Sequence, residues 1–232
     1  MLFDLLTSGE NFKNVLANVL LTIPVIILAL SVHELSHGFV AHLCGDDTAK
    51  NHGRLTLNPV KHLDPIGTLC MFLIGFGWAK PVPVIMRNFK KPRRDMFFVA
   101  FAGPLSNILS ALIYAPLYIL SYKWWWELAV EGSKMARPIE MLSTMMLYGI
   151  ILNIGLAIFN LIPVPPLDGS NMLLTSLPPQ LAARYSRIGQ YSRYIILGAL
   201  VLSYIGVDVF YPLSWLTTKI AVEFLKVFSF LW

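Results

Sequence analysis

The hydrophobic positions of the chain fall into four long stretches that are almost free of charge. The first has no charged residue from Asn14 to Val32, and its apolar pattern resumes after His37 and continues to Cys44. At about 1.5 Å of rise per residue, such a stretch is long enough to cross a bilayer core of about 30 Å. The sequence predicts four transmembrane helices, at about residues 14–44, 96–122, 141–162 and 194–211.

The end of the chain has a different pattern. Lys219, Glu223 and Lys226 recur at helical spacing and place charge on one face, whereas apolar residues fill the rest. This pattern is typical of a helix lying at the membrane interface, and a fifth span is the alternative. We therefore predict a C-terminal helix at about residues 213–231, either interfacial or spanning.

The loop between the first two predicted spans, residues 46–95, carries a pattern of its own. Residues 65–78 are uncharged but too short to cross a bilayer, which indicates a hairpin or re-entrant segment. Residues 54–57 and 82–84 alternate as in a strand, with proline where only an edge strand accepts it. The sequence predicts a small membrane-associated β element here, with a surface loop dipping into lipid headgroups as the alternative.

The amino-acid composition indicates that most of the chain is surrounded by lipid. Of its 232 residues, 56% are hydrophobic and 13% are charged, whereas about a quarter of the residues in soluble domains are charged. These values exclude a disordered chain, a secreted disulfide scaffold and an ordinary cytosolic enzyme. We expect an all-α polytopic membrane protein that forms one domain over residues 1–232. Cys44 and Cys70 are too few for a disulfide framework and are expected to be free thiols.

The positive charge of the chain, +5 in total, has its source in the loops. Residues 46–95 hold nine Lys or Arg against four Asp, whereas residues 123–140 hold three basic and three acidic residues. Because cytoplasmic loops are enriched in Lys and Arg, we expect residues 46–95 and 163–192 in the cytoplasm and residues 123–140 outside. The positive charge of the loops is explained by this orientation in the membrane, so no nucleic-acid partner is expected.

The first predicted helix carries the candidate chemistry, the HExxH motif of residues 33–37. Residues four apart on a helix differ by about 40° in azimuth, so His33 and His37 can hold one tetrahedral metal ion. Glu34 can then act as general base toward a water molecule. Ionisable residues inside an apolar span are usually functional, which weighs against mere packing of polar side chains.

A catalytic zinc site needs a third protein ligand and an open fourth position. His42 lies about 140° around the helix from the second motif histidine and points away. His52 and His62 lie in the basic loop and are expected to be surface or sheet residues. Asp168 is the better candidate because it follows a stiff Pro-rich segment. The second and third predicted spans carry the chain across the membrane and back, so Asp168 is expected at the same membrane face as the end of the first helix.

These motifs resemble the site-2 protease family of intramembrane zinc metalloproteases. The resemblance rests on HExxH in the first span, Gly-Pro-Leu-Ser-Asn at residues 103–107 in the second, and NxxPxPxLDG at residues 160–169 after the third. It implies a Zn²⁺ ion held by His33, His37 and Asp168, with Glu34 activating the water. It also implies that Asn107 and Asn160 contact the substrate backbone or the oxyanion, for which hydrogen bonds between helices are the alternative.

The resemblance also implies a function. The expected enzyme is a zinc metalloendopeptidase that cleaves a transmembrane protein substrate close to the cytoplasmic face. The loops are too short for an inserted PDZ domain, and no nucleotide-sensing domain is expected after the last helix. Both features suggest the compact prokaryotic branch of the family and a prokaryotic cell membrane. A membrane metal-binding or transport protein without proteolytic activity is the alternative, and an inactive scaffold is disfavoured by the intact motif.

Overall fold

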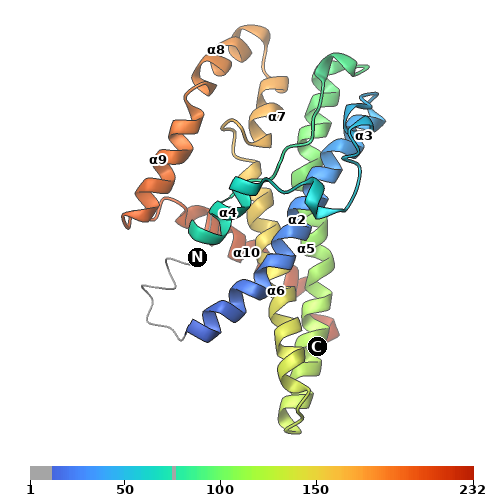
Figure 1. Cartoon of the computed structure of the whole chain (residues 1–232), viewed down its shortest axis with the longest axis vertical. Coiled ribbons are helices and arrows are strands. Elements are labelled where there is room, and N and C mark those ends of the chain that lie inside the picture. Colours follow the sequence, from blue (N-terminus) through green and yellow to red (C-terminus); the bar gives the residue numbers. More distant parts are fainter. Residues whose placement is uncertain (1–11, 75–76) are drawn as a thin grey trace.

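The computed structural model describes residues 12–74 and 77–232, and these residues form a helical structure (Figure 1). The α-helices are α2 (Phe12–Leu43), α3 (Thr48–Asn51), α4 (Pro65–Ile74), α5 (Pro92–Val130), α6 (Ala136–Asn160), α7 (Asp168–Ser176), α8 (Pro179–Gly189), α9 (Ser192–Tyr204) and α10 (Tyr211–Val227). Three short 3-10 helices accompany them, η1 (Pro59–Lys61), η2 (Met86–Asn88) and η3 (Ser229–Leu231).

Three helices of the described chain are long and apolar enough to cross a membrane. They are α2 from Val19 to Leu43, the 39-residue α5 and the 25-residue α6. Each coincides with one of the first three predicted spans. The prediction of a helical integral membrane protein is therefore confirmed.

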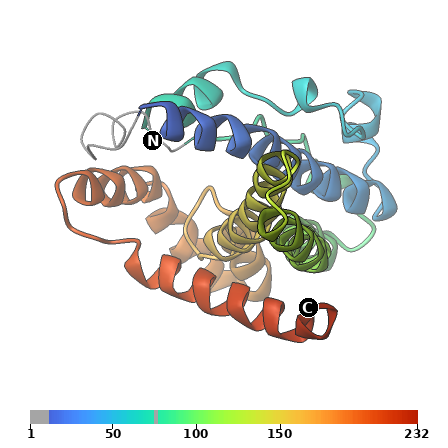
Figure 2. The same ribbon diagram turned by 90° about the horizontal axis from the view of Figure 1, so that it is seen from below.

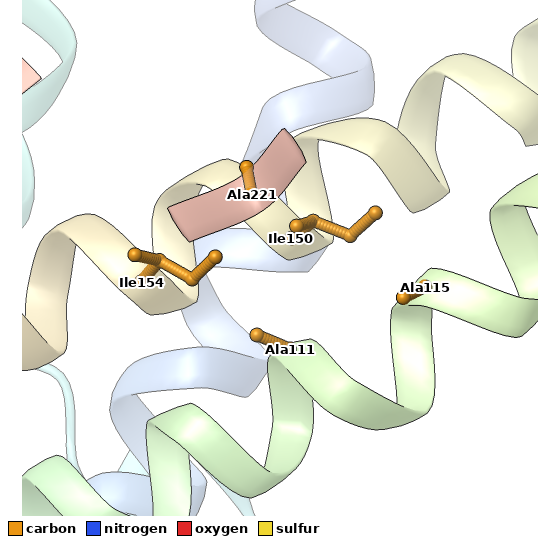
Figure 3. Close-up of a cluster of buried hydrophobic side chains, with 5 residues drawn as sticks. All are labelled: Ala111, Ala115, Ile150, Ile154 and Ala221. Atoms are coloured by element: carbon orange, nitrogen blue, oxygen red, sulfur yellow. The ribbon is translucent and has the colours of Figure 1, made fainter. Parts of the chain in front are cut away.

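The helices α5 and α6 lie side by side at the centre of the molecule. Viewed from below, α2 lies on one side of this pair and α10 lies across the other side (Figure 2). The contact between α5, α6 and α10 is made by small and β-branched residues, all of them buried: Ala111, Ala115, Ile150, Ile154 and Ala221 (Figure 3). Alanine lets helix backbones approach closely, which is the usual basis of helix packing in lipid.

The predicted fourth span is not confirmed. The helix at this position, α9, has 13 residues, and about 20 Å of helix is shorter than a bilayer core of about 30 Å. Gly206 adopts a φ of +95° just after this helix, a conformation that favours glycine and ends the regular structure. The span was predicted from the near absence of charged residues, and this pattern does not show that a helix ends near Gly206.

The predicted ligand loop, residues 163–192, is mostly helical. The Pro-rich residues 163–167 are irregular, because proline cannot continue the hydrogen bonding of α6, and short links at 177–178 and 190–191 separate the helices. The helix α7 begins directly at Asp168, and α8 follows from Pro179. The candidate ligand Asp168 therefore stands at the first position of a helix.

The predicted β element is not confirmed in the described part of the first loop. No strand is present there, and Leu63 and Ala79 form one isolated antiparallel bridge. Pro81 and Pro83 lack a backbone N–H and cannot extend a ladder. The guanidinium of Arg54 instead donates hydrogen bonds to the carbonyls of Lys80 and Pro81, at 3.2 and 2.9 Å.

The segment predicted as a hairpin or re-entrant element, residues 65–78, contains α4. Its ten residues make a helix too short to cross a bilayer, as the sequence indicated. Residues 75–76 lie outside the described part of the chain.

The first loop packs closely against α2, one turn beyond Glu34. A Cβ placed on Gly38 would lie 2.8 Å from Leu55 Cδ2 and 3.2 Å from Val82 Cγ1. Glycine at this position of α2 lets these loop side chains approach without having to shift. The loop segment around Val82 is thus held beside the HExxH motif.

Candidate metal centre

The two motif histidines face each other from successive turns of α2. Their side chains are buried, and their Nε2 atoms lie 3.1 Å apart. The ring centroids are 4.7 Å apart and the rings are nearly perpendicular, at 85°. The helical spacing of four residues thus brings one nitrogen of each ring to a common point.

Asp168 brings a carboxylate to the same point from α7. Its Oδ2 lies 3.1 Å from Nε2 of His33 and 3.3 Å from Nε2 of His37. The neighbouring Gly169 allows this placement, since a Cβ there would meet the backbone of Leu161 well inside van der Waals contact. Glycine thereby lets the start of α7 fold back against the end of α6.

The other ring nitrogens bind groups elsewhere. His37 Nδ1 lies 2.7 Å from the carbonyl oxygen of Val99, and His33 Nδ1 lies 2.5 Å from Oδ1 of Asn107. A carbonyl oxygen only accepts hydrogen bonds, so Nδ1 of each ring carries the proton. Each Nε2 then presents a lone pair toward Asp168.

Three acceptor atoms thus converge with no proton donor between them. The buried Oδ2 of Asp168 makes no hydrogen bond in the described structure, although it lies within ion-pair distance of both rings. Around a tetrahedral zinc ion with bonds of about 2.0–2.1 Å, ligand atoms are about 3.3 Å apart. The observed separations of 3.1 to 3.3 Å fit this geometry.

Gly103 on α5 forms the wall of the site. A Cβ at this position would lie 2.6 Å from Cε1 of His33 and closer still to Nε2 of His37. A side chain at this position would collide with both imidazole rings. Among the described residues, His33, His37 and Asp168 form a group able to hold a metal, and they fit zinc in donor type and spacing.

Glu34 lies beside this group and is not part of it. Its Oε2 accepts a hydrogen bond of 2.9 Å from the backbone N–H of Val82 in the first loop. The side chain is half-buried. The carboxylate therefore has one oxygen held by the loop next to the histidine pair.

The remaining histidines lie apart from the metal group. His42 forms an ion pair with Asp47 at the end of α2, and His52 is exposed. His62 is fully buried, and its Nε2 lies 2.7 Å from the carbonyl oxygen of Thr56. The expectation of a surface or sheet position therefore does not hold for His62.

The two asparagines of the family motifs have different surroundings. Asn107 is fully buried and bonds to His33 on one side and to Asn153 of α6 on the other. These bonds agree with the helix-to-helix alternative, and contact of Asn107 with a substrate stays a prediction. Asn160 is half-buried and donates from Nδ2 to the carbonyl of Leu156, at 3.0 Å. Asn153 was not singled out from sequence, although a polar residue inside an apolar span is a signal of function.

Known proteins resemble this chain over most of its length. The model for peptidase family M50 matches residues 21–202. The chain belongs to this family. The Bacillus subtilis protein named "Putative zinc metalloprotease YwhC" is 40% identical over 188 residues, which cover 81% of this chain and 83% of that protein. The Mycolicibacterium smegmatis protein named "Putative zinc metalloprotease Rip2" is 25% identical over 185 residues, 75% of this chain and 64% of that protein. No solved structure matches the chain.

Family membership confirms three predictions made from the sequence. The resemblance to site-2 proteases is correct, the enzyme is a zinc metalloendopeptidase of that type, and its cofactor is Zn²⁺. The convergence of two imidazoles and a carboxylate supplies ligands of the kind that zinc prefers.

Proposed function

We propose that the chain hydrolyses a peptide bond within or near a transmembrane segment of a membrane-protein substrate, close to the cytoplasmic face. In this proposal His33, His37 and Asp168 hold the zinc ion and Glu34 is the general base. The observation that carries it is the convergence of three acceptor atoms, 3.1 to 3.3 Å apart, beside the carboxylate of Glu34.

The chemistry follows from the positions of these side chains. When bound, zinc supplies a Lewis acid that polarises a peptide carbonyl and lowers the pKa of water toward neutrality. Glu34 accepts the proton of the attacking water and passes it to the leaving amine. The hydrogen bond from Val82 to Oε2 orients this carboxylate and leaves Oε1 without a bond to the described part of the loop, so that Oε1 is the oxygen we assign to the proton transfer.

The substrate must present an extended backbone at this site. Carbonyls of a helical segment are already hydrogen-bonded within the helix, so the segment has to unwind locally before attack. The segment around Val82 lies next to Glu34, and we propose that it contacts the unwound substrate. Asn107 and Asn160 are the proposed contacts with substrate backbone or oxyanion, and Asn160, half-buried at the end of α6, is the more exposed of the two.

The depth of the site supports cleavage inside the membrane. Gly103, which borders the two histidines, lies ten residues along α5 from Arg93, or about 15 Å. Arg93 and Arg94 mark one end of α5, and the exposed Trp124 and Trp126 lie toward the other. Basic residues favour the cytoplasmic side and aromatic residues mark the interfaces, which supports a cytoplasmic orientation of the site.

We further propose that the chain forms a single domain in a prokaryotic cell membrane, with a fourth crossing that involves α9. This helix is short, but Ile195, Leu197 and Val201 on its surface are exposed. Apolar side chains of this kind are suited to contact with lipid. The proposed partners are the bilayer and the substrate, without nucleic acid.

A Glu34→Gln variant tests the proposed function directly. Membrane proteomes of cells that make the wild-type chain or the variant are compared for new fragment ends within transmembrane segments. We expect such ends with the wild type alone, and equal zinc content in both purified proteins, because Glu34 does not bind the metal. Identical fragments in both cultures would remove Glu34 from the mechanism. Absence of fragments together with zinc flux into liposomes would favour a transporter.

A further inference from the structure

A chain of side-chain amides runs from the metal group through α5 to α6. Asn107 and Asn153 are both fully buried, on α5 and α6. His33 Nδ1 lies 2.5 Å from Asn107 Oδ1, and Asn107 Nδ2 donates to Asn153 Oδ1 at 2.8 Å. Asn153 Nδ2 donates to the carbonyl of Gly149, also at 2.8 Å. Polar groups at this depth are expensive in an apolar span, so a complete chain of them needs a reason.

The carbonyl at the end of the chain determines the direction of every bond in it. The oxygen of Gly149 can only accept, so Asn153 must turn its Nδ2 toward it and its Oδ1 toward Asn107. Asn107 then gives its Nδ2 to Asn153 and presents Oδ1 to His33. A second contact supports this orientation, because Asn107 Nδ2 also donates to the carbonyl of Ala29, at 3.4 Å.

We propose that Asn153 is a positioning residue for zinc, which acts through Asn107 to select the tautomer of His33. Since Oδ1 of Asn107 faces the ring, Nδ1 must carry the proton and Nε2 keeps its lone pair for the metal. Without Asn153, the amide of Asn107 keeps only the longer bond of 3.4 Å to the carbonyl of Ala29, so it can rotate more easily and offer Nδ2 to the ring. That orientation favours the tautomer protonated on Nε2, which cannot bind zinc.

The second histidine needs no such device. His37 Nδ1 lies against the backbone carbonyl of Val99, an acceptor that cannot rotate. The helix α5 therefore orients both rings, one through its backbone and the other through Asn107. His37 serves as an internal reference, because changes at Asn153 leave its acceptor in place.

The inference rests on the proposed role of His33 as a zinc ligand, but it is tested without proteolysis. Zinc affinity is measured by chelator competition on the purified full-length chain. Loss of a partner that orients a metal-bound histidine typically lowers metal affinity by about 10- to 100-fold, and we expect this loss in Asn153→Leu. We expect Asn153→Asp to retain zinc affinity, because a buried, protonated carboxyl can donate to Gly149 and accept from Asn107.

A double variant separates this role from simple bonding between helices. If Asn153 acts through Asn107, the pair Asn107→Leu and Asn153→Leu together should lower zinc affinity no more than Asn107→Leu alone. Ser143→Ala is the matched control, because Ser143 is a buried polar residue of the same helix outside the amide chain. It should leave zinc affinity unchanged.

Proton NMR of the zinc-loaded protein reports on the rings themselves. We expect a slowly exchanging Nδ1–H signal from both histidines in the wild type, loss of the His33 signal in Asn153→Leu, and retention of the His37 signal. The inference would be overturned if the losses of zinc affinity in the double variant were additive. It would also be overturned if Asn153→Leu kept the zinc affinity of the wild type and showed only a lower unfolding temperature. In either case the two asparagines would serve only as a hydrogen bond between α5 and α6. A protein that binds zinc as expected but cleaves nothing would count against the proposed function alone.

Discussion

The carboxylate of Glu34 accepts a hydrogen bond from the backbone N–H of Val82, 48 residues further along the chain. Pro81 and Pro83 flank this residue and have no N–H to offer, so the short segment presents one backbone donor. The proposed general base is thus held by a backbone group of the loop, which a substitution removes only if it introduces proline. The first loop is part of the site as well as a connection between spans.

Removing this donor should slow the reaction without releasing zinc. Val82→Pro deletes the N–H, and a hydrogen bond to a charged group is worth about 1.5–3 kcal/mol. If the bond positions Glu34 in the transition state, kcat should fall by about 10- to 100-fold. Val82→Ala keeps the N–H and should lose far less activity. Equal activities for the two variants would show that the bond does not contribute.

A methyl group at position 103 should block the metal site. The Cβ of Gly103→Ala would lie 2.6 Å from Cε1 of His33, inside van der Waals contact, and in the space between the histidine pair and α5. We expect loss of bound zinc, measured by metal analysis of the purified chain. Gly198→Ala is the control, because the same change there meets no atom within 4 Å and should leave zinc content unchanged. Full zinc content in Gly103→Ala would place the metal elsewhere.

The sequence was sufficient for features whose signal is local. Uncharged stretches identified α2, α5 and α6, and the spacing of His33 and His37 follows from the helix period alone. The choice of Asp168 combined a local motif with the parity of membrane crossings. By contrast, the docking of Val82 on Glu34 and the amide chain through Asn153 depend on long-range packing, which no short pattern encodes. The fourth span is not confirmed, because α9 has only 13 residues and Gly206 follows directly after its end region.

The proposed ligand set predicts a contrast between Asp168 and the three distant histidines. Asp168→Ala should lose most of its zinc and all cleavage, because two ligands hold catalytic zinc weakly. His42→Ala, His52→Ala and His62→Ala should keep their zinc, since none of these side chains lies in the metal group. Asp168→Asn should show a partial loss, because an amide oxygen keeps the shape without the charge. Zinc loss in one of the histidine variants, with Asp168→Ala unaffected, would redraw the ligand set.

Asp46 should make the stability of the first loop depend on pH. Burial raises the pKa of this carboxyl, but hydrogen bonds from the backbone of Ile85, from Thr48 and from Asn88 outweigh burial and hold the pKa below 3.8. A lowered pKa stabilises the folded state above the unfolded value, and this contribution is lost as the pH falls through the folded value. Asp46→Asn should therefore unfold at a lower temperature than the wild type at pH 7, with a smaller difference near pH 3. A constant difference across this range would exclude ionisation of Asp46 as the cause.

The proposed orientation predicts which loops a membrane-impermeant thiol reagent can reach. Lys90 and Glu131 are both exposed, at opposite ends of α5, and they belong to loops of different charge balance. In a chain with Cys44 and Cys70 replaced by Ser, we expect Glu131→Cys to be labelled from outside intact cells. Lys90→Cys should be labelled only after the membrane is opened. Because Lys90 lies at the end of α5 that carries Gly103 and the metal group, the opposite labelling pattern would place the active site toward the outer face.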